Sequence, residues 1–458
     1  MKRFFSLFLA VSSLLQTVTS IAITRPSYGG TLHVAMGAAP STLDPVGSEQ
    51  TDWFATRNLS RILFDTLVWC DDHGNLQPAL ATSWHADSGD QRWQFSLRHG
   101  VRFSDGSPLT AEVVAGSLRA ANPRWKVFSS GIEVVVETDF PNSSLAAELA
   151  LPRNSIVKRQ GNQISGTGAF AVAHWDPGKK LTVTANTDYW NGRPFVDSIE
   201  IDLGKNLREQ AISLDLHKAD VIETAPVGHP SSTENFRAGF SAPEELLALV
   251  FSTDHPSPED ARLRDILALS IDRDALNNVV LQGGGEISAA LLPNWMTGYG
   301  FVFASEVNLA RAGEEFAEAR PKKPWTLGYD STDPMARVVA ERIILNARDA
   351  GLLLQLSTKA GDLRLVRVPI VSANPHVAMT RLAETLGLPQ PKFASDSTDD
   401  LYAAESSLLQ SRRVIPLLHL RTASEVRPNI RDWAQTQDGS WHLEDVWLSP
   451  EKIGAEKP

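Results

Sequence analysis

Apolar and polar residues alternate over several short stretches of the chain, which is the pattern of half-buried β-strands. Trp93, Phe95 and Leu97 are separated by polar residues, so their side chains would share one face of a strand. The same pattern and β-rich composition predict strands at residues 31–36, 93–97, 132–138, 181–185, 198–201, 247–252, 325–329 and 352–356.

Helices are indicated by capping residues that precede amphipathic segments. Ser257-Pro258 begins one such segment, with proline at the first helical position, where its missing N–H costs nothing. Asp272 caps the next segment, and Asp333-Pro334 begins a third that Gly351 closes just before strand 352–356. Strands and helices do not show the regular spacing of one doubly wound sheet. We therefore expect α/β lobes built from discontinuous segments.

The first 22 residues resemble a secretory signal peptide rather than part of the fold. Met1-Lys2-Arg3 is positively charged and residues 4–15 are mainly apolar. Ser20 and Ala22 are small residues at the third and first positions before a cleavage site after Ala22. The alternative is an uncleaved membrane anchor, but the apolar stretch is shorter than the roughly 20 residues of a spanning helix. No cysteine lies near the cut, so we expect a periplasmic protein without a lipid anchor.

Composition narrows the function further. The chain has 458 residues, 43 of them Lys or Arg and 54 Asp or Glu, and the basic residues form no long block, which argues against a nucleic-acid partner. Cys70 is the single cysteine, so no internal disulfide can form. A chain of this length has room for two large lobes or about three domains.

Searches for catalytic and metal-binding motifs find none. There is no Gly-x-Ser-x-Gly elbow and no His-Glu-x-x-His. No two of the 11 histidines lie two, three or four residues apart, which is the spacing of metal ligands. The glycines at 283–285 lack the Lys-Ser/Thr of a phosphate loop, and Asp71-Asp72 and Asp399-Asp400 are interpreted as solvated turns. The chain is therefore expected to bind without catalysis, with no catalytic residue, no metal site and no cofactor.

Several short sequence blocks, each different from the others, follow one another along the chain. They are Gly30 to Val34, Ser41 to Pro45, Leu76 to Trp84, Trp93 to Val114, Gly166 to Phe170, Asn186 to Pro194, Arg262 to Leu276 and Val414 to Leu417. In order and spacing these blocks resemble the family 5 extracellular solute-binding proteins, the dipeptide- and oligopeptide-binding receptors of ATP-driven importers. Within the blocks, Trp84, Trp93, Tyr189 and Trp190 are interpreted as packing residues, and Gly166 and Gly168 as residues of a tight turn.

The resemblance implies an α/β fold with the two lobes of a periplasmic binding protein (type II-like, cluster C) and an extra subdomain inserted in the first lobe. The implied division assigns residues 1–22 to the signal peptide, 23–42, 164–248 and 415–458 to the sheet domain of lobe I, 43–163 to the inserted subdomain, and 249–414 to lobe II. The lobes would close over a ligand by a hinge motion.

The second lobe departs from the family pattern. In peptide-binding members, a strand ends in a motif with aspartates, one of which holds the free amino group of the peptide. Here that region is shortened, and Ser372 and Asn374 stand where carboxylates would be expected. A neutral side chain cannot offset an ammonium charge, which weakens the expectation of ordinary peptide binding.

Candidate ligand contacts follow from the implied cleft. Ser372 and Asn374 are the first, with a turn before Pro375 as the alternative role. The loop after the first strand, containing Gly37, Ala38 and Ala39, offers free backbone groups to an extended ligand, and Trp295 and Tyr299 would form an aromatic wall unless they pack in the core. Arg264 and Arg367 would suit an anionic ligand, although a surface position is favoured for each.

We therefore expect an exported, monomeric protein that captures a small peptide-like or other polar solute and delivers it to the permease subunits of an ABC transporter. The alternative within the same fold is a sensor or partner-binding module that has lost transport. From another class, a periplasmic hydrolase is the less favoured alternative.

Overall fold

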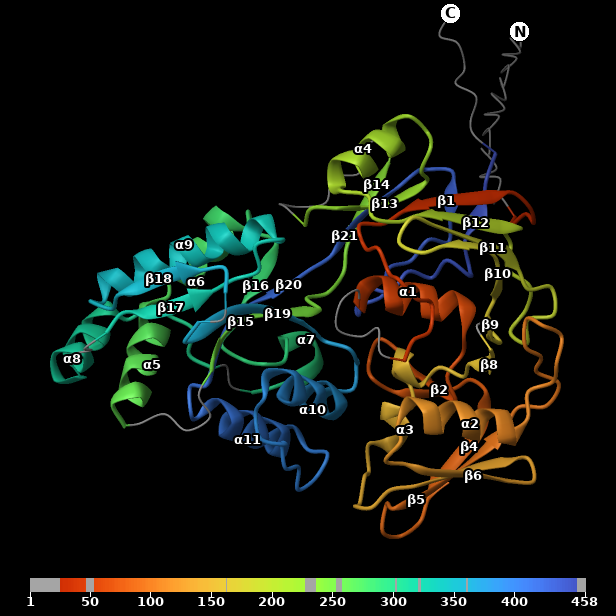
Figure 1. Ribbon diagram of the computed structural model, residues 1–458, viewed down its shortest axis with the longest axis horizontal. Coiled ribbons are helices and arrows are strands. Elements are labelled where there is room, and N and C mark those ends of the chain that lie inside the picture. The colour runs from red at the N-terminus through yellow and green to blue at the C-terminus, as the bar shows by residue number, and fades with distance from the viewer. Residues whose placement is uncertain are drawn as a thin grey trace, which may run out of the picture.

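The protein is described by a computed structural model that covers residues 25–46, 53–161, 163–226, 236–252, 258–300, 303–319, 323–359 and 361–450. The predicted signal peptide, residues 1–22, lies outside these ranges. The fold has two lobes side by side, each built on its own sheet, and a smaller subdomain below the first lobe (Figure 1). The expectation of a two-lobe α/β fold with an added subdomain is confirmed.

Lobe I contains a seven-stranded sheet with the order β10-β11-β12-β1-β13-β21-β14. Its central strands β12, β1 and β13 are parallel, and the outer strands are antiparallel. Strand β1 joins β12 along its whole length, from Thr31 opposite Ser198 to Ala35 opposite Asp202. The elements of this lobe are β1 (Thr31–Ala35), α1 (Trp53–Leu63), β10 (Phe170–Asp176), β11 (Lys180–Ala185), β12 (Ser198–Asp202), α4 (Leu207–Asp215), β13 (Val221–Thr224), β14 (Arg237–Phe240) and β21 (Ala423–Val426).

Lobe II contains a six-stranded sheet with the order β16-β20-β15-β19-β17-β18. Its strands are β15 (Glu245–Phe251), β16 (Gly285–Ile287), β17 (Trp325–Gly328), β18 (Leu354–Ser357), β19 (Leu363–Pro369) and β20 (Val414–Leu420). Its helices are α5 (Pro258–Ser270), α6 (Arg273–Ala275), η2 (Leu276–Val280), α7 (Asn294–Thr297), α8 (Leu309–Ala319), α9 (Pro334–Asp349), α10 (Pro375–Leu386) and α11 (Thr398–Leu409).

Strand β15 shows why both faces of the lobe II sheet are covered. All seven of its residues are buried, and its side chains alternate between two cores. Leu247 and Leu249 pack with α5, α8 and α9 on one face, whereas Leu246 and Ala248 pack with α10 and α11 on the other. The continuous apolar run in the sequence is therefore a central strand.

The subdomain is an antiparallel sheet, β4-β5-β7-β6, covered by α2. Its alternating strand is as predicted, since Trp93, Phe95 and Leu97 are all buried. The Thr110 hydroxyl caps α2 by accepting a hydrogen bond from the Val113 backbone N–H. The elements here and in the connecting segments are β2 (Val68–Cys70), β3 (Leu76–Pro78), β4 (Ala81–Ala86), β5 (Arg92–Leu97), α2 (Ala111–Ala121), β6 (Lys126–Ser130), β7 (Glu133–Glu137), α3 (Leu145–Glu148), η1 (Pro152–Asn154), β8 (Lys158–Gln160) and β9 (Gln163–Ser165).

The pairing of the crossing strands corrects the domain boundaries expected from the sequence. β15 and β20 pair with each other inside the lobe II sheet, so residues 245–248 and 415–420 belong to lobe II rather than to lobe I. Helix α1, assigned by sequence to the inserted subdomain, packs through Leu59 and Ile62 into the lobe I core. The shift has a simple reason: each crossing strand is buried along its whole length and mostly apolar, so its sequence does not show where one sheet ends.

Gly166 and Gly168 allow a close approach of two backbones. A Cβ atom at Gly166 would lie 1.9 Å from the Leu63 carbonyl oxygen, and one at Gly168 would lie 2.4 Å from the Leu63 carbonyl carbon. Neither glycine has a positive φ, so the missing Cβ atom matters here for the close approach of the backbones rather than for a left-handed conformation. They let the segment before β10 lie directly against the end of α1, which places α1 beside the site described next.

The remaining strands are β22 (Ile430–Arg431) and β23 (Trp447–Leu448), which form a short antiparallel pair near the C-terminus. Among the helices of the described ranges, none is both long enough and apolar enough to cross a bilayer.

Candidate ligand-binding site

A cavity of about 350 Å³ lies between the two lobes. Lobe I and its subdomain contribute α1, the end of β2 with the turn after it, residues 150–155 and residues 189–191. Lobe II contributes residues 371–373, which connect β19 to α10, and the C-terminal segment contributes residues between 436 and 445. The volume is at the lower end of the range for small-molecule sites.

Arg57 on α1 links this cavity to the crossing between the lobes. The residue is only 5% exposed, and its guanidinium lies 3.0 Å from Glu244 and 3.8 Å from Asp438. Burial raises the pKa of Glu244 to about 8, although the Arg57 charge opposes the shift. Burial would also raise the pKa of Asp438, but Arg57 and hydrogen bonds from Thr436 and Ser440 hold it at about 2. Arg57 is thus balanced mainly by Asp438 at neutral pH.

Arg61, one helical turn further along α1, holds a second ionic cluster. Its Nε atom donates to Glu444 at 2.7 Å, and one Nη atom lies 2.9 Å from Nδ1 of His442. Burial would raise the pKa of Glu444, but the Arg61 charge and His442 lower it to about 2. Glu444 is therefore a carboxylate at physiological pH, fixed to α1.

Asp65 lies just beyond the end of α1 and organises the aromatic side of the cavity. Its carboxyl group accepts hydrogen bonds from the Thr167 hydroxyl at 2.7 Å, the Trp190 indole N–H at 2.9 Å and the Tyr189 hydroxyl at 3.1 Å. Burial raises the pKa of Asp65, with these hydrogen bonds opposing the rise. Tyr189 and Trp190, interpreted from sequence as packing residues, therefore also line the cavity.

The lobes are in contact at the edge of the cavity. Arg57 donates a 3.0 Å hydrogen bond from α1 to the Ile370 carbonyl oxygen of lobe II. Ala147 and Leu151 of the subdomain pack against Val377 of α10. A Cβ atom at Gly74 would lie 2.8 Å from the Ala373 carbonyl oxygen, so the β2–β3 turn also abuts lobe II. These contacts enclose the cavity between surfaces of both lobes.

His442, Glu444 and Asp445 bring three possible metal ligands within 4.8 Å of one another. Arg61 already donates to Glu444 Oε1 and contacts His442 Nδ1. A metal ion at these atoms would have to displace or face that guanidinium, which the donor arrangement disfavours. The described side chains do not form a ready metal centre.

Only one of the predicted ligand contacts lines this cavity. Ser372 does so, and its hydroxyl also accepts a hydrogen bond from the Asn374 backbone N–H at 3.1 Å. The Asn374 side chain caps α10 by accepting from the backbone N–H groups of His376 and Val377, which is the turn role considered as the alternative. Both residues are therefore used by the fold before any ligand binds.

The other predicted contacts lie elsewhere. Gly37 donates its N–H to Glu223 at 3.1 Å, and the loop that also holds Ala38 and Ala39 packs against Gly204 and Gly178 within lobe I. Trp295 donates its indole N–H to the Pro243 carbonyl oxygen. Tyr299 packs in the lobe II core against Phe303 and Tyr402. None of these residues is among those that line the interlobe cavity.

The two arginines considered as anion partners also have structural roles. Arg264 is buried rather than at the surface, and its guanidinium lies 4.4 Å from the centre of the Phe251 ring. Arg367 is half-exposed and pairs with Glu245 and with Asp333. The expected surface position is therefore wrong for Arg264.

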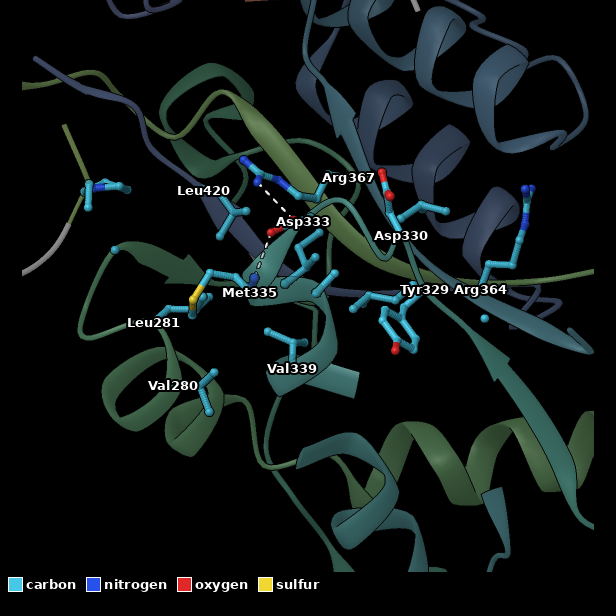
Figure 2. A pocket seen from close by; sticks show the side chains of 18 of the residues that line it. Val280, Leu281, Tyr329, Asp330, Asp333, Met335, Val339, Arg364, Arg367 and Leu420 are labelled. Carbon is cyan, nitrogen blue, oxygen red and sulfur yellow. Dashed lines mark hydrogen bonds and ion pairs between the residues drawn. The ribbon is translucent and has the colours of Figure 1, made fainter. Parts of the chain in front are cut away.

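A second, larger cavity of about 640 Å³ lies on the α9 side of the lobe II sheet. Figure 2 shows Leu281, Met335 and Val339 around it, with Arg367 and Asp333 joined by an ion pair of 3.3 Å at its edge. Apart from Ala225, Pro226 and Arg421 near the crossing, its lining comes from lobe II. We take the interlobe cavity as the candidate site because its walls come from both lobes, so that a hinge motion would open and close it.

Sequence reasoning missed most of the interlobe cavity. Asp71 and Asp72 line it, although their pattern indicates only a solvated turn. Arg57 and Arg61 on α1 and Asp65 just beyond its end recur with helical spacing, which is a signal of one polar face but not of a site. The C-terminal residues Asp438 and Glu444 carry no local signal, because only the tertiary fold brings them to α1.

Comparison with known proteins agrees with the fold. The family model of the bacterial extracellular solute-binding proteins, family 5 (middle region), matches residues 75–383. The nickel-binding protein NikA of Staphylococcus aureus is 24% identical over 56% of this chain, and the match spans 54% of its own length. The probable D,D-dipeptide-binding periplasmic protein DdpA of Escherichia coli is 22% identical over 72% of this chain and 70% of its own length. This chain thus spans about half to two thirds of the length of these relatives.

Among solved structures, NikA from Brucella suis in complex with Fe(III)-EDTA superimposes with a TM-score of 0.78 at 18% identity, covering 92% of this chain and 100% of that one. The likeness shows the same two-lobe architecture. The family model covers more than half of the sequence. The chain therefore belongs to family 5 of the bacterial extracellular solute-binding proteins.

Proposed function

We propose that this protein is an exported solute receptor that captures a small ligand in the interlobe cavity and delivers it to the permease of an ABC transporter. Binding would draw the two lobes together, and the permease would recognise the closed form. The protein would act as a monomer in the periplasm, without catalysis and without a lipid anchor.

The observation that carries the proposal is the composition of the cavity wall. One small cavity is bounded by α1 and the β2–β3 turn on one side and by residues 371–373 on the other. A ligand that touches both sides binds the closed form better than the open form, which is the condition for ligand-driven closure. The names of the relatives, which include nickel- and dipeptide-binding proteins, support a transport role without fixing the solute.

A ligand panel on the purified full-length protein tests the proposal. Thermal unfolding would be recorded with dipeptides, sugars, metal chelates and opines, and radius of gyration by X-ray scattering with any ligand that stabilises. A ligand at 100 times its dissociation constant stabilises the fold by about 2.7 kcal/mol. We expect at least one compound to raise the unfolding temperature and to reduce the radius of gyration.

A cavity-filling variant provides the control. Ala150 lines the interlobe cavity, so Ala150→Trp should abolish the ligand response, whereas Ala173→Trp on the exposed part of edge strand β10 should keep it. The proposal fails if the whole panel leaves the wild-type protein unchanged, or if Ala150→Trp responds like the wild type.

A further inference from the structure

The interlobe cavity has an excess of acidic groups. Its lining includes six carboxyl groups, two guanidinium groups and one imidazole: Asp65, Asp71, Asp72, Asp438, Glu444 and Asp445, Arg57 and Arg61, and His442. The enclosing walls have a low dielectric constant, which strengthens the field of such an excess. The sign of the cavity is therefore negative.

Both arginines are already engaged by carboxylates of the protein. Arg57 lies between Glu244 and Asp438 and donates to a backbone carbonyl oxygen. Arg61 is held by Glu444 and His442. Because these guanidinium groups are fixed by neighbouring acids, they are poorly placed to neutralise an anionic ligand.

Three carboxylates at the rim differ from Asp438 and Glu444, because none of them pairs with an arginine of the described residues. Among the described residues, Asp71 accepts hydrogen bonds from its own turn and from Gln77 of β3, and these lower its pKa against the opposing effect of burial. Asp72 accepts one from the Gln437 backbone N–H at 3.3 Å. Asp445 lies 3.6 Å from His442. Within the described ranges, no Lys or Arg forms an ion pair with any of the three.

Two further groups in the cavity suit a cation with an apolar part. Trp69 lines the cavity and is 40% exposed, which is high for a residue of its size. The indole of Trp190, by contrast, is covered by the Arg98 guanidinium at 4.4 Å. Glu444 Oε2 is buried and accepts no hydrogen bond from the described residues. An aromatic face near unpaired carboxylates is a known way to recognise ammonium groups.

From this arrangement we propose that the solute captured by the interlobe cavity is a small organic cation, with an ammonium or guanidinium group held by the acidic rim and an apolar part lying on Trp69. The inference rests on the proposed function and names the class of its ligand. It also replaces the sequence-based reasoning about Ser372 and Asn374: the carboxylates that would hold a positive charge come from the β2–β3 turn and the C-terminal segment instead of from the end of β19.

Two matched sets of probes test the charge of the ligand by isothermal titration calorimetry on the full-length protein. One set is phenethylamine, 2-phenylethanol and 3-phenylpropionate; the other is 1,5-diaminopentane, 1,5-pentanediol and glutarate. We expect binding by an amine and at least tenfold weaker binding by its neutral and anionic counterparts. A neutral or anionic probe that binds as well as its amine overturns the inference and leaves the proposed function standing.

Two outcomes bear on the other possibilities. Binding of Ni²⁺ without an organic ligand, lost on His442→Ala, would assign the cavity to a metal ion and overturn the inference. Silence of all six probes counts against the organic cation, while the proposed function is decided separately by its broader ligand panel and by Ala150→Trp.

Charge-neutralising variants localise the effect. Asp72→Asn should weaken amine binding about fivefold at low salt, the range of a solvent-exposed ion pair, and the loss should shrink as salt is raised. Asp349→Asn, which removes the same charge from an exposed position at the end of α9, is the matched control and should bind as the wild type does. Equal effects of the two variants would show a general effect of net charge and contradict the proposed site.

Discussion

Replacing Arg57 by methionine tests the ionic cluster that joins α1 to the crossing between the lobes. The change keeps much of the apolar stem of the side chain and removes the guanidinium. That group contacts Glu244 at 3.0 Å and Asp438 at 3.8 Å and donates to the Ile370 carbonyl oxygen at 3.0 Å. All three interactions would be lost in a site that is only 5% exposed.

The expected loss of stability can be worked from these contacts. Removal of one partner of a buried ion pair costs about 3–5 kcal/mol when the other charge stays buried and unpaired. Glu244 has a pKa of about 8 and is already largely protonated at pH 7, so its part of that cost is avoided. The Ile370 carbonyl and Asp438 remain without their donor and counter-charge. We therefore expect the free energy of unfolding to fall by about 3 kcal/mol at pH 7.

The pH dependence distinguishes this explanation from simple loss of packing. The pKa of Glu244 is raised in the folded state, so its contribution favours the fold below its ordinary pKa of 4.5 and is lost as the pH rises through about 8. Arg57 opposes the rise of this pKa, so in the variant the pKa of Glu244 rises further, and above pH 8 the fold must keep protonated a carboxyl that the unfolded chain ionises. The loss caused by Arg57→Met should therefore be larger at pH 9 than at pH 6.

Urea unfolding followed by tryptophan fluorescence at pH 6, 7 and 9 measures the effect. Arg337→Met, on the exposed face of α9, is the matched control and should leave the midpoint unchanged. The reasoning is refuted if Arg57→Met unfolds at the same urea concentration as Arg337→Met, or if its loss of stability is the same at pH 6 and pH 9.

Three other changes test separate parts of the structure. Gly168→Ala should destabilise the fold by about 1–3 kcal/mol, because its Cβ would lie 2.4 Å from the Leu63 carbonyl carbon. The control Gly116→Ala, inside α2 with open space around it, should stabilise the fold by about 0.5–1 kcal/mol. Equal melting temperatures of the two variants would contradict the close approach. Glu444→Gln should lose about 3 kcal/mol near neutral pH and flatten acid unfolding between pH 4.5 and 2, where the wild-type carboxylate takes up its proton; an unchanged acid profile would argue against it. Trp69→Ala should weaken amine binding in calorimetry, because the partly exposed side chain lines the cavity; unchanged affinity would remove Trp69 from the site.

The sequence predicted most local structure because local structure depends on neighbouring residues. The alternation of Trp93, Phe95 and Leu97 and the cap formed by Asp333 both appear as expected. The sequence blocks, through their resemblance to the family 5 solute-binding proteins, predicted the two-lobe fold. Boundaries inside crossing strands could not be predicted, since β15 and β20 are buried along their whole length and look alike on both sides of the crossing.

The site was less accessible to sequence reasoning for a physical reason. Its charged residues lie on α1, in the β2–β3 turn and in the C-terminal segment, and hundreds of residues separate Arg61 from Glu444 along the chain. No period or spacing relates such positions. The end of β19 is where the family pattern directs attention, but there Ser372 and Asn374 are occupied with the start of α10.

Native mass spectrometry of the protein, isolated without denaturation from the periplasm, tests the central claim most directly. The wild-type protein and Ala173→Trp should both carry a small molecule that is released on activation, and Ala150→Trp, with its cavity filled, should be free of it. A wild-type protein with no bound small molecule, or the same molecule retained by Ala150→Trp, would contradict the claim that the interlobe cavity holds the solute.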